Sequence, residues 1–500
     1  MRKCRLISSF VFVVALLVAL PISGQVRSDE SHRRARQVLD AASQALGPEF
    51  DTISYRVEGK LHARDQSPNA DGAPVALDFR GALGFDLKRD RLAWEAGALF
   101  PGGFNFHGKS LVKDGKGTAL DLVGRTATPI PNPAQLREII GLRIPRYLVM
   151  QAVQRSTSLR WVGEADYQGR KQNVVSFATA LGSLVTLYFD ARTNLPTKYE
   201  LLGTDPIAGD AITEVIIMGY ETVEGRQLSK GHIQTIAGQP AQEWRYSGIR
   251  LNPPIEESAL DAPGDFKPAV QLPQTPAVKE LAKDVYQVEG LGAGAYRSLF
   301  VVFNDYVLVV EGVLNDATSG AVLDKIKETA PGKPVRYVAQ THHHADHSGG
   351  LRTYIAEGVT VVTTPGNVEF VKRFAAAPFT VQPDTLAKKA RAPVIETIRD
   401  KKRVFTDGTH TVELYDIGPA PHANEMVIAW LPREKILFTG DLFGRYADDS
   451  LVPANEGTQH LAKAIGRLGL PVETIVDVHT RPSPMADLQK AFSLSAPAAN

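Results

Sequence analysis

The sequence predicts two domains of different fold class, a mainly antiparallel β domain followed by an α/β domain. Residues 52–251 contain short alternating or apolar runs separated by Gly, Asn, Asp and Pro, which is typical of antiparallel strands. From residue 285 onward, strand-like runs alternate with helical runs, which is typical of an α/β domain. Six prolines within residues 252–280 predict a linker between the two.

The first 24 residues have the pattern of a signal peptide. A basic start at Arg2, Lys3 and Arg5 precedes an apolar run over residues 6–20, and small residues end the segment at Gly24. An uncleaved membrane anchor is the alternative, although the apolar run is short for a span. We therefore expect a periplasmic or secreted protein with no membrane span after cleavage. The predicted organisation is residues 1–24 signal peptide, 25–251 β-rich accessory domain, 252–280 linker and 281–490 α/β domain.

Composition narrows the class of partner and of metal ligand. The chain has 500 residues, of which 43% are hydrophobic and 22% charged, and its formal net charge is +1. Because the strongly basic balance of a nucleic-acid binder is missing, we expect no nucleic-acid partner. The expected partner is a small-molecule substrate, apolar or anionic. The single cysteine, Cys4, lies in the predicted signal peptide. A metal in the mature chain must therefore be bound by His, Asp, Glu or water.

In the β domain, a short helix over residues 31–43 comes first, because Ala35, Val38, Leu39 and Ala42 share one helical face. A helical insert is expected over residues 134–153, after three prolines that interrupt the strand pattern. The strands are expected at residues 53–57, 75–79, 83–87, 184–189, 212–220 and 242–249. This arrangement loosely resembles the curved half-barrels of LolA-like periplasmic lipoprotein carriers. The resemblance implies a concave sheet that holds an apolar ligand or a substrate tail, and a purely structural or dimerising domain is the alternative.

In the α/β domain, the apolar and amphipathic runs predict the following elements. Helices are expected at residues 317–330, 351–357, 365–374 and 461–468. Strands are expected at residues 285–289, 298–303, 306–311, 335–340, 359–363, 411–417, 426–431, 436–439 and 475–478, with another near residue 404.

The most informative stretch is residues 341–350, Thr-His-His-His-Ala-Asp-His-Ser-Gly-Gly. Its His342, His344, Asp346 and His347 are imidazole and carboxylate ligands, which divalent metals such as zinc accept readily. The stretch follows a predicted strand, and open α/β sheets place their sites at strand ends. A histidine-rich surface tract is the alternative interpretation.

Three further candidate ligands each follow a predicted strand. They are His422 after residues 411–417, Asp441 after residues 436–439, and His479 after residues 475–478. Strand ends can converge at one sheet edge, so we expect these side chains to join the first motif. Five histidines and two aspartates are enough for two divalent ions that share a carboxylate.

These motifs resemble the metallo-β-lactamase superfamily over about residues 280–485. The H-x-H-x-D-H motif is matched by residues 342–347, and the later His, Asp and His occur in the family's order. The resemblance implies a four-layered αββα sandwich. It also implies that His342, His344 and His422 bind a first metal, that Asp346, His347 and His479 bind a second, and that Asp441 bridges both. The sequence departs from the family pattern at Glu311, where Asp is usual and a position behind the ligands is implied, and at Thr480, where Gly is common.

The predicted ligand set indicates hydrolysis. Two zinc ions, with iron or manganese as alternatives, would activate a bridging hydroxide, and Asp346 would act as the catalytic carboxylate that orients it. The expected substrate is an ester, lactone, thioester or amide. An iron-dependent oxidoreductase of the same superfamily is an alternative, because imidazole and carboxylate ligands do not separate zinc from iron. A ligand-binding protein with a vestigial metal site is another.

Four other features complete the predictions. Arg445 is a candidate for binding a substrate carboxylate. Residues 372–403 carry nine Lys or Arg side chains, and we expect either a lid over the site or a solvated helix face. His343 lies between two ligands in sequence, so its side chain should point away from the metals. We expect it and His460 to be structural.

Overall fold

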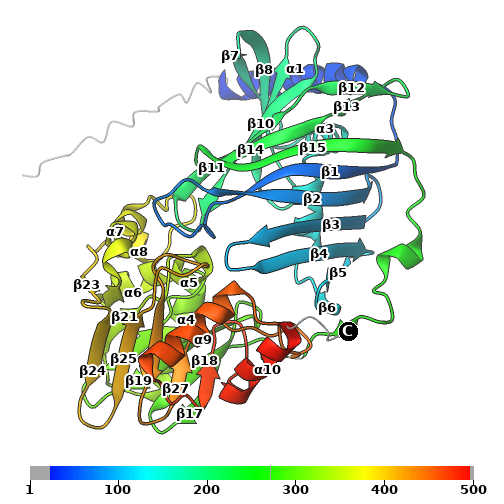
Figure 1. Ribbon diagram of the computed structural model, residues 1–500. Helices are drawn as coiled ribbons and strands as arrows, with labels where there is room; N and C mark the ends of the chain where they lie inside the picture. The colour runs from blue at the N-terminus through cyan, green and yellow to red at the C-terminus, as the bar shows by residue number, and fades with distance from the viewer. Residues whose placement is uncertain (1–22, 271, 496–500) are drawn as a thin grey trace, which may run out of the picture.

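The fold is that of a computed structural model, which describes residues 23–270 and 272–495 (Figure 1). The predicted signal peptide lies outside these residues except for its last two. Within the described ranges, no helix has both the length and the apolar character needed to cross a membrane. The predicted sequence of a mainly antiparallel β domain and an αββα domain is confirmed.

The N-terminal domain is built on one 14-stranded sheet with the order β16-β6-β5-β4-β3-β2-β1-β15-β14-β11-β10-β9-β8-β7. Only the β16–β6 pair is parallel. A separate hairpin is formed by β12 (Tyr220–Val223) and β13 (Arg226–Ser229). The strands of the large sheet are β1 (Thr52–Ala63), β2 (Val75–Asp86), β3 (Arg91–Phe100), β4 (Phe104–Lys113), β5 (Lys116–Asp121), β6 (Thr126–Pro129), β7 (Arg160–Tyr167), β8 (Arg170–Ala178), β9 (Leu184–Asp190), β10 (Pro196–Asp205), β11 (Gly209–Ile217), β14 (Gly231–Ile236), β15 (Gln239–Leu251) and β16 (Lys267–Pro268).

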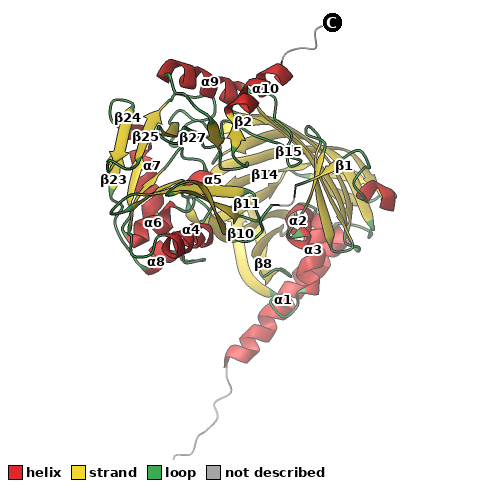
Figure 2. Cartoon of the chain, turned by 90° about the horizontal axis from the view of Figure 1, so that it is seen from below, coloured by secondary structure: helices red, strands yellow, loops and turns green. Residues whose placement is uncertain are grey.

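Three helices pack against this sheet: α1 (Ser23–Ala45), α2 (Pro133–Gly141) and α3 (Pro145–Gln154). Figure 2 shows α2 and α3 within the curve of the sheet. Two apolar cores result, because α1 and α3 bury side chains against β8 and β9 while α2 and α3 contact β1, β2 and β3. The resemblance to lipoprotein carriers remains a prediction.

Two elements differ from the sequence-based expectation. The runs at residues 75–79 and 83–87 form one continuous strand, β2. A side chain at Gly81 would lie 2.5 Å from the Glu95 carbonyl oxygen of β3, so glycine is what lets the strand pass that point. The helical insert is two helices, because Pro145 lacks the N–H that would continue α2 and instead occupies the first turn of α3.

The predicted linker is partly ordered. It contains a short 3₁₀ helix, Glu257–Leu260, and β16 adds to the large sheet beside β6. Strand β17 (Ala277–Ala282) already pairs with the first sheet of the C-terminal domain, four residues before the expected boundary at residue 281. At the other end, helix α10 (Met485–Ser495) continues past residue 490.

The C-terminal domain has two sheets packed face to face, with helices on both outer sides. The first sheet consists of β17, β18 (Val285–Leu291), β19 (Tyr296–Val302), β20 (Val307–Val310), β21 (Val335–Ala339), β22 (Thr360–Thr363) and β23 (Ile395–Thr397). The second consists of β24 (Lys402–Thr406), β25 (Thr411–Asp416), β26 (Val427–Leu431), β27 (Ile436–Phe438), β28 (Thr474–Val476) and β29 (Ser483–Pro484). The two inner faces share one buried apolar core.

The helices of this domain begin and end at residues suited to these positions. The Asn315 and Asn455 side chains accept from the backbone N–H groups of Thr318 and Thr458, and so cap α4 (Asp316–Thr329) and α9 (Glu456–Leu468). Gly358, with φ of 81°, ends α6 (Leu351–Glu357), and Gly469, with φ of 63°, ends α9. The other helices between β20 and β28 are α5 (Ala345–Ser348), α7 (Val368–Ala376) and α8 (Thr385–Lys388), with a 3₁₀ turn at Pro365–Asn367.

The two domains are joined by loops as well as by the linker. The Asp210 carboxylate at the β10–β11 turn accepts from the backbone N–H groups of Thr380 and Val381 at 2.9 Å. The Gly457 N–H of α9 donates to the Gly102 carbonyl in the β3–β4 loop at 3.1 Å. The β1–β2 loop also reaches the C-terminal domain (Figure 1), and its contacts belong to the site described below.

A buried histidine makes the stability of the N-terminal domain depend on pH. Burial, with a smaller effect of Arg143, lowers the pKa of His232 to about 3. Between the unfolded value of about 6.5 and 3, only the unfolded chain binds this proton, so stability falls as pH falls through that window. The expected loss is roughly 2–3 kcal/mol between pH 6 and pH 4.

His232→Gln should flatten this pH dependence of the free energy of unfolding. Urea unfolding followed by tryptophan fluorescence measures it, because the Trp244 ring lies 5.1 Å from the His232 ring. His107→Gln, on a more exposed side chain, is the matched control. An unchanged slope in His232→Gln would contradict this assignment.

Candidate metal centre

Seven His and Asp side chains meet at one end of the C-terminal domain, where strands of both sheets terminate. The loop after β21 and the short helix α5 supply four of them, and the segments after β25, β27 and β28 supply one each. The side chains are the ones predicted from the sequence: His342, His344, Asp346, His347, His422, Asp441 and His479.

The first group is formed by His342, His344, His422 and Asp441, whose donor atoms all lie within 4.8 Å of one another. His342 Nε2 lies 3.1 Å from His344 Nδ1 and 3.2 Å from His422 Nε2. Asp441 Oδ2 is 2.9 Å from His422 Nε2. Three imidazole nitrogens and a carboxylate oxygen that face one point are a donor set suited to a divalent ion.

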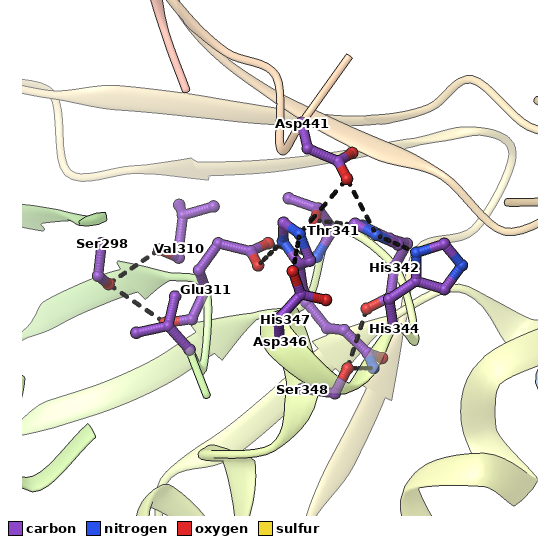
Figure 3. A network of polar contacts seen from close by, with 12 residues as sticks. Ser298, Val310, Glu311, Thr341, His342, His344, Asp346, His347, Ser348 and Asp441 are labelled. Carbon is purple, nitrogen blue, oxygen red and sulfur yellow. Dashed lines mark hydrogen bonds and ion pairs between the residues drawn. The ribbon is translucent and has the colours of Figure 1, made fainter. Parts of the chain in front are cut away.

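The second group is formed by Asp346, His347 and His479, again with donor atoms within 4.8 Å. Asp346 Oδ2 is 3.6 Å from His347 Nε2 and 3.7 Å from His479 Nε2. Asp441 lies between the groups, because its Oδ2 is 3.5 Å from His347 Nε2 and 3.8 Å from His342 Nε2. Figure 3 shows this arrangement around Asp441.

The electrostatics of the groups also suit a cation. Burial lowers the pKa of His342 and His344 well below the usual range, so both imidazoles are neutral and have a free lone pair. At His347 burial acts in the same direction, but the Asp346, Glu311 and Asp441 carboxylates outweigh it and raise the pKa. Asp441 Oδ1 is buried and has no hydrogen-bond partner among the described residues. A metal ion would satisfy this oxygen and replace the proton on His347.

Glu311 holds two parts of the metal loop in place. Its Oε1 accepts from the Thr341 N–H at 3.0 Å, and its Oε2 lies 2.8 Å from His347 Nδ1 (Figure 3). This contact fixes which ring nitrogen of His347 faces the ligand cluster. Glu311 has a backbone φ of 87°, an uncommon value for a residue other than glycine.

The β1–β2 loop of the N-terminal domain completes one side of the site. Gln66 Nε2 donates to Asp346 Oδ1 at 2.9 Å. The Ser67 carbonyl oxygen lies 2.8 Å from His343 Nε2 and 3.2 Å from His344 Nε2. The sequence analysis did not identify Gln66 or Ser67, because they lie in the loop between β1 and β2, 276 or more residues before their partners in the metal motif. Only the packing of the two domains brings them to it.

Three other residues singled out in the sequence, His343, His460 and Arg445, contact other groups of the protein. His343 points to the Ser67 carbonyl, and His460 Nε2 donates to the Ile417 carbonyl at 2.8 Å. The Arg445 guanidinium is bound by Asp487, by Ser483 Oγ at 3.0 Å and by the Asp449 carbonyl at 2.7 Å. Each guanidinium nitrogen of Arg445 thus donates to a group of the protein, and substrate binding by Arg445 stays a prediction.

Residues 372–403 form part of the scaffold. The segment includes the end of α7, helix α8 and strand β23, which pairs with β22 at the edge of the first sheet. Six of its nine basic side chains form ion pairs with carboxylates. This favours the solvated-face interpretation over the lid.

Residues 291–477 match the family model of the metallo-beta-lactamase superfamily. The predicted resemblance of the C-terminal domain to this superfamily is confirmed. The chain is 24% identical over 179 residues to a metallo-beta-lactamase type 2 from Bacteroides fragilis, an overlap of 34% of this chain and 64% of that relative's length. Among solved structures, a metallo-beta-lactamase from Hirschia baltica is similar at 18% identity with a TM-score of 0.34, covering 45% of this chain and 99% of its own. One from Pontibacter korlensis is similar at 20% identity and a TM-score of 0.33, covering 44% and 99%.

Replacing Glu311 with Gln should weaken metal binding at the second group. The amide cannot accept from both Thr341 and His347 as the carboxylate does, and loss of such a supporting contact typically costs 10–100-fold in metal affinity. Competition with a chelator measures the affinity. Glu328→Gln, on the exposed face of α4, is the control. Equal affinities in the two variants would show that Glu311 does not support the site.

Gln66→Ala tests whether the N-terminal domain contributes to the site. The variant loses the 2.9 Å contact to Asp346, and we expect a drop of about tenfold in affinity for the second metal equivalent. Gln168→Ala, in the exposed β7–β8 turn, leaves this contact intact and should bind metal like the parent. If Gln66→Ala also binds like the parent, the β1–β2 loop only covers the site.

Proposed function

We propose that this protein is an exported metal-dependent hydrolase that binds two zinc ions and cleaves an ester, lactone, thioester or amide bond. The observation that carries the proposal is the convergence of seven imidazole and carboxylate side chains into two adjoining groups. Superfamily membership of the C-terminal domain supports the reaction class. The first ion would be held by His342, His344 and His422, the second by Asp346, His347 and His479, and Asp441 would face both.

The bound ions and the Asp346 carboxylate would have different roles in the reaction. When bound, divalent ions of this kind lower the pKa of a water molecule and polarise a carbonyl oxygen. Asp346 is suited to orient the nucleophile and accept its proton, because its side chain is 22% exposed and Gln66 holds its other oxygen.

Substrate would approach the second group. The His479 side chain is 33% exposed, whereas those of His342 and His347 are fully buried. Tyr296 lies on the same side with its ring 4.9 Å from the His479 ring, and burial beside Asp346 raises its pKa to about 12. Its phenol therefore stays protonated at neutral pH and can donate a hydrogen bond to a substrate.

The first test is metal content by elemental analysis, together with a visible spectrum of the purified protein. We expect about two zinc ions per chain and no colour. Bound iron with visible absorption would instead favour an oxidoreductase, and a protein without metal after purification in the absence of chelators would contradict the hydrolase.

Asp346→Asn should lose activity while the protein keeps its fold. An amide can still lie beside His347 but cannot accept a proton, so we expect a fall in kcat of at least about 100-fold on any ester, lactone or β-lactam that the parent hydrolyses. Circular dichroism and metal content are measured on the same samples. Asp324→Asn, on α4, is the control. Retained activity in Asp346→Asn would exclude this carboxylate as the base.

A further inference from the structure

A cavity of about 710 Å³ adjoins the candidate metal centre. It is lined by His479 and Thr480 and by three arginines, Arg297, Arg445 and Arg481. Two of these cations have carboxylate partners, because Arg445 pairs with Asp487 and Arg481 pairs with Asp449. Asp449, which also lines the cavity, is therefore itself neutralised.

The surroundings of the third arginine, Arg297, differ from those of Arg445 and Arg481. Its side chain is among the largest fully buried ones, with 1% exposure, and its Nε and Nη1 groups have no hydrogen-bond partner among the residues that the structure describes. Burial lowers the pKa of this guanidinium, with Glu289 and Asp477 only partly opposing the effect. A buried guanidinium with two unpaired N–H groups is costly, and such a group in a cavity indicates a missing anionic partner.

A larger cavity of about 920 Å³ lies under the N-terminal sheet. Its walls include Trp94 and Trp244 of the sheet and Ile139 of α2, and the rings of Phe104 and Phe106 also line it. Ile139, Phe104 and Phe106 are 49%, 54% and 42% exposed, which leaves apolar surface open inside a concave site. Sites of this size and lining bind apolar molecules or apolar parts of them.

The two cavities are neighbours. Thr128 of β6 and the segment Arg445, Tyr446 and Ala447 of the C-terminal domain line both of them, so these residues lie between the apolar space and the space at His479. The apolar cavity also includes Gly103, beside the Gly102 backbone that packs against His422. The metal centre is thus flanked by an apolar site on one side and a cationic site on the other.

We propose that this pair of cavities binds an amphipathic anion, with its carboxylate or phosphate on Arg297 and its hydrocarbon chain in the cavity under the N-terminal sheet. That this ligand is the substrate or product rests on the proposed hydrolase function. The anionic group would supply the acceptors that Arg297 lacks, and a guanidinium binds either acid in a bidentate manner. The hydrocarbon chain would cover the exposed aromatic and aliphatic side chains of the larger cavity.

The test is binding of dodecanoate, dodecyl phosphate, dodecanol and acetate to the purified protein by calorimetry, below the concentrations at which the amphiphiles form micelles. We expect the two long-chain anions to bind at least about tenfold more tightly than dodecanol, and acetate to bind most weakly. The better of the two anions identifies the acid. Equal binding of dodecanol and both anions, or no binding of any long-chain ligand, would overturn the proposal.

Arg297→Met should remove the preference for the anions and leave dodecanol binding unchanged. Because two N–H groups of the replaced cation are buried without hydrogen-bond partners, the thermal midpoint of this variant should be equal to or higher than that of the parent. Arg297→Lys keeps the charge and should retain part of the preference. Arg467→Leu, on the exposed end of α9, is the control for removing an arginine. A lowered midpoint, or unchanged dodecanoate affinity in Arg297→Met, would show that Arg297 has a structural role instead.

Ile139→Asn tests the apolar part of the site. It should weaken dodecanol and dodecanoate alike, whereas Leu99→Asn, at a 62% exposed side chain outside the cavity, should weaken neither. These measurements need no catalysis. If Arg297-dependent binding is present but the protein hydrolyses no ester or thioester, the hydrolase function fails while the binding site stands. If hydrolysis is present and Arg297→Met binds dodecanoate like the parent, only the present inference fails.

Discussion

The side-chain carboxylate of Glu311 imposes the constraint on which the metal centre depends. It is fully buried at the end of β20 and contacts both the first residue of the metal loop, through the Thr341 N–H, and the ligand His347. Ser298 Oγ donates to the backbone carbonyl of Glu311 at 3.2 Å, which anchors the residue to the neighbouring strand β19. A buried carboxylate is stable only when its acceptors are used, so these hydrogen bonds and the position of the loop are fixed together.

The ligands beyond that loop follow from strand geometry. The segments that carry His422, Asp441 and His479 leave strands of the second sheet at the edge that faces the metal loop. The two sheets are held face to face by one core that includes Val309 and Val338 of the first sheet and Leu414 and Ala429 of the second. The apolar core therefore sets the separation of the ligand groups.

Two loops of the N-terminal domain cover part of the candidate metal site in the C-terminal domain. Its β1–β2 loop covers His343 and His344, and its β3–β4 loop packs against His422, so the first ligand group is shielded from solvent. The second group remains accessible beside His479, which lines the smaller of the two cavities. The accessory domain lines the larger, neighbouring cavity with aromatic side chains.

The sequence by itself determined the class of both domains, the seven candidate ligands and the place of Glu311, because these depend on local patterns. Strand periodicity extends over a few residues, and the metal motif occupies six consecutive positions. It did not determine the contacts of Gln66 and Ser67, the pairing of Arg445 with Asp487 or the two buried, unpaired N–H groups of Arg297. Only the tertiary structure decided these, because each depends on which side chains far apart in the chain become neighbours when the two domains pack. A hydrogen bond between residues 66 and 346 leaves no periodic signal in either segment. Whether an arginine is paired is likewise a property of its three-dimensional surroundings, and the sequence shows only its charge.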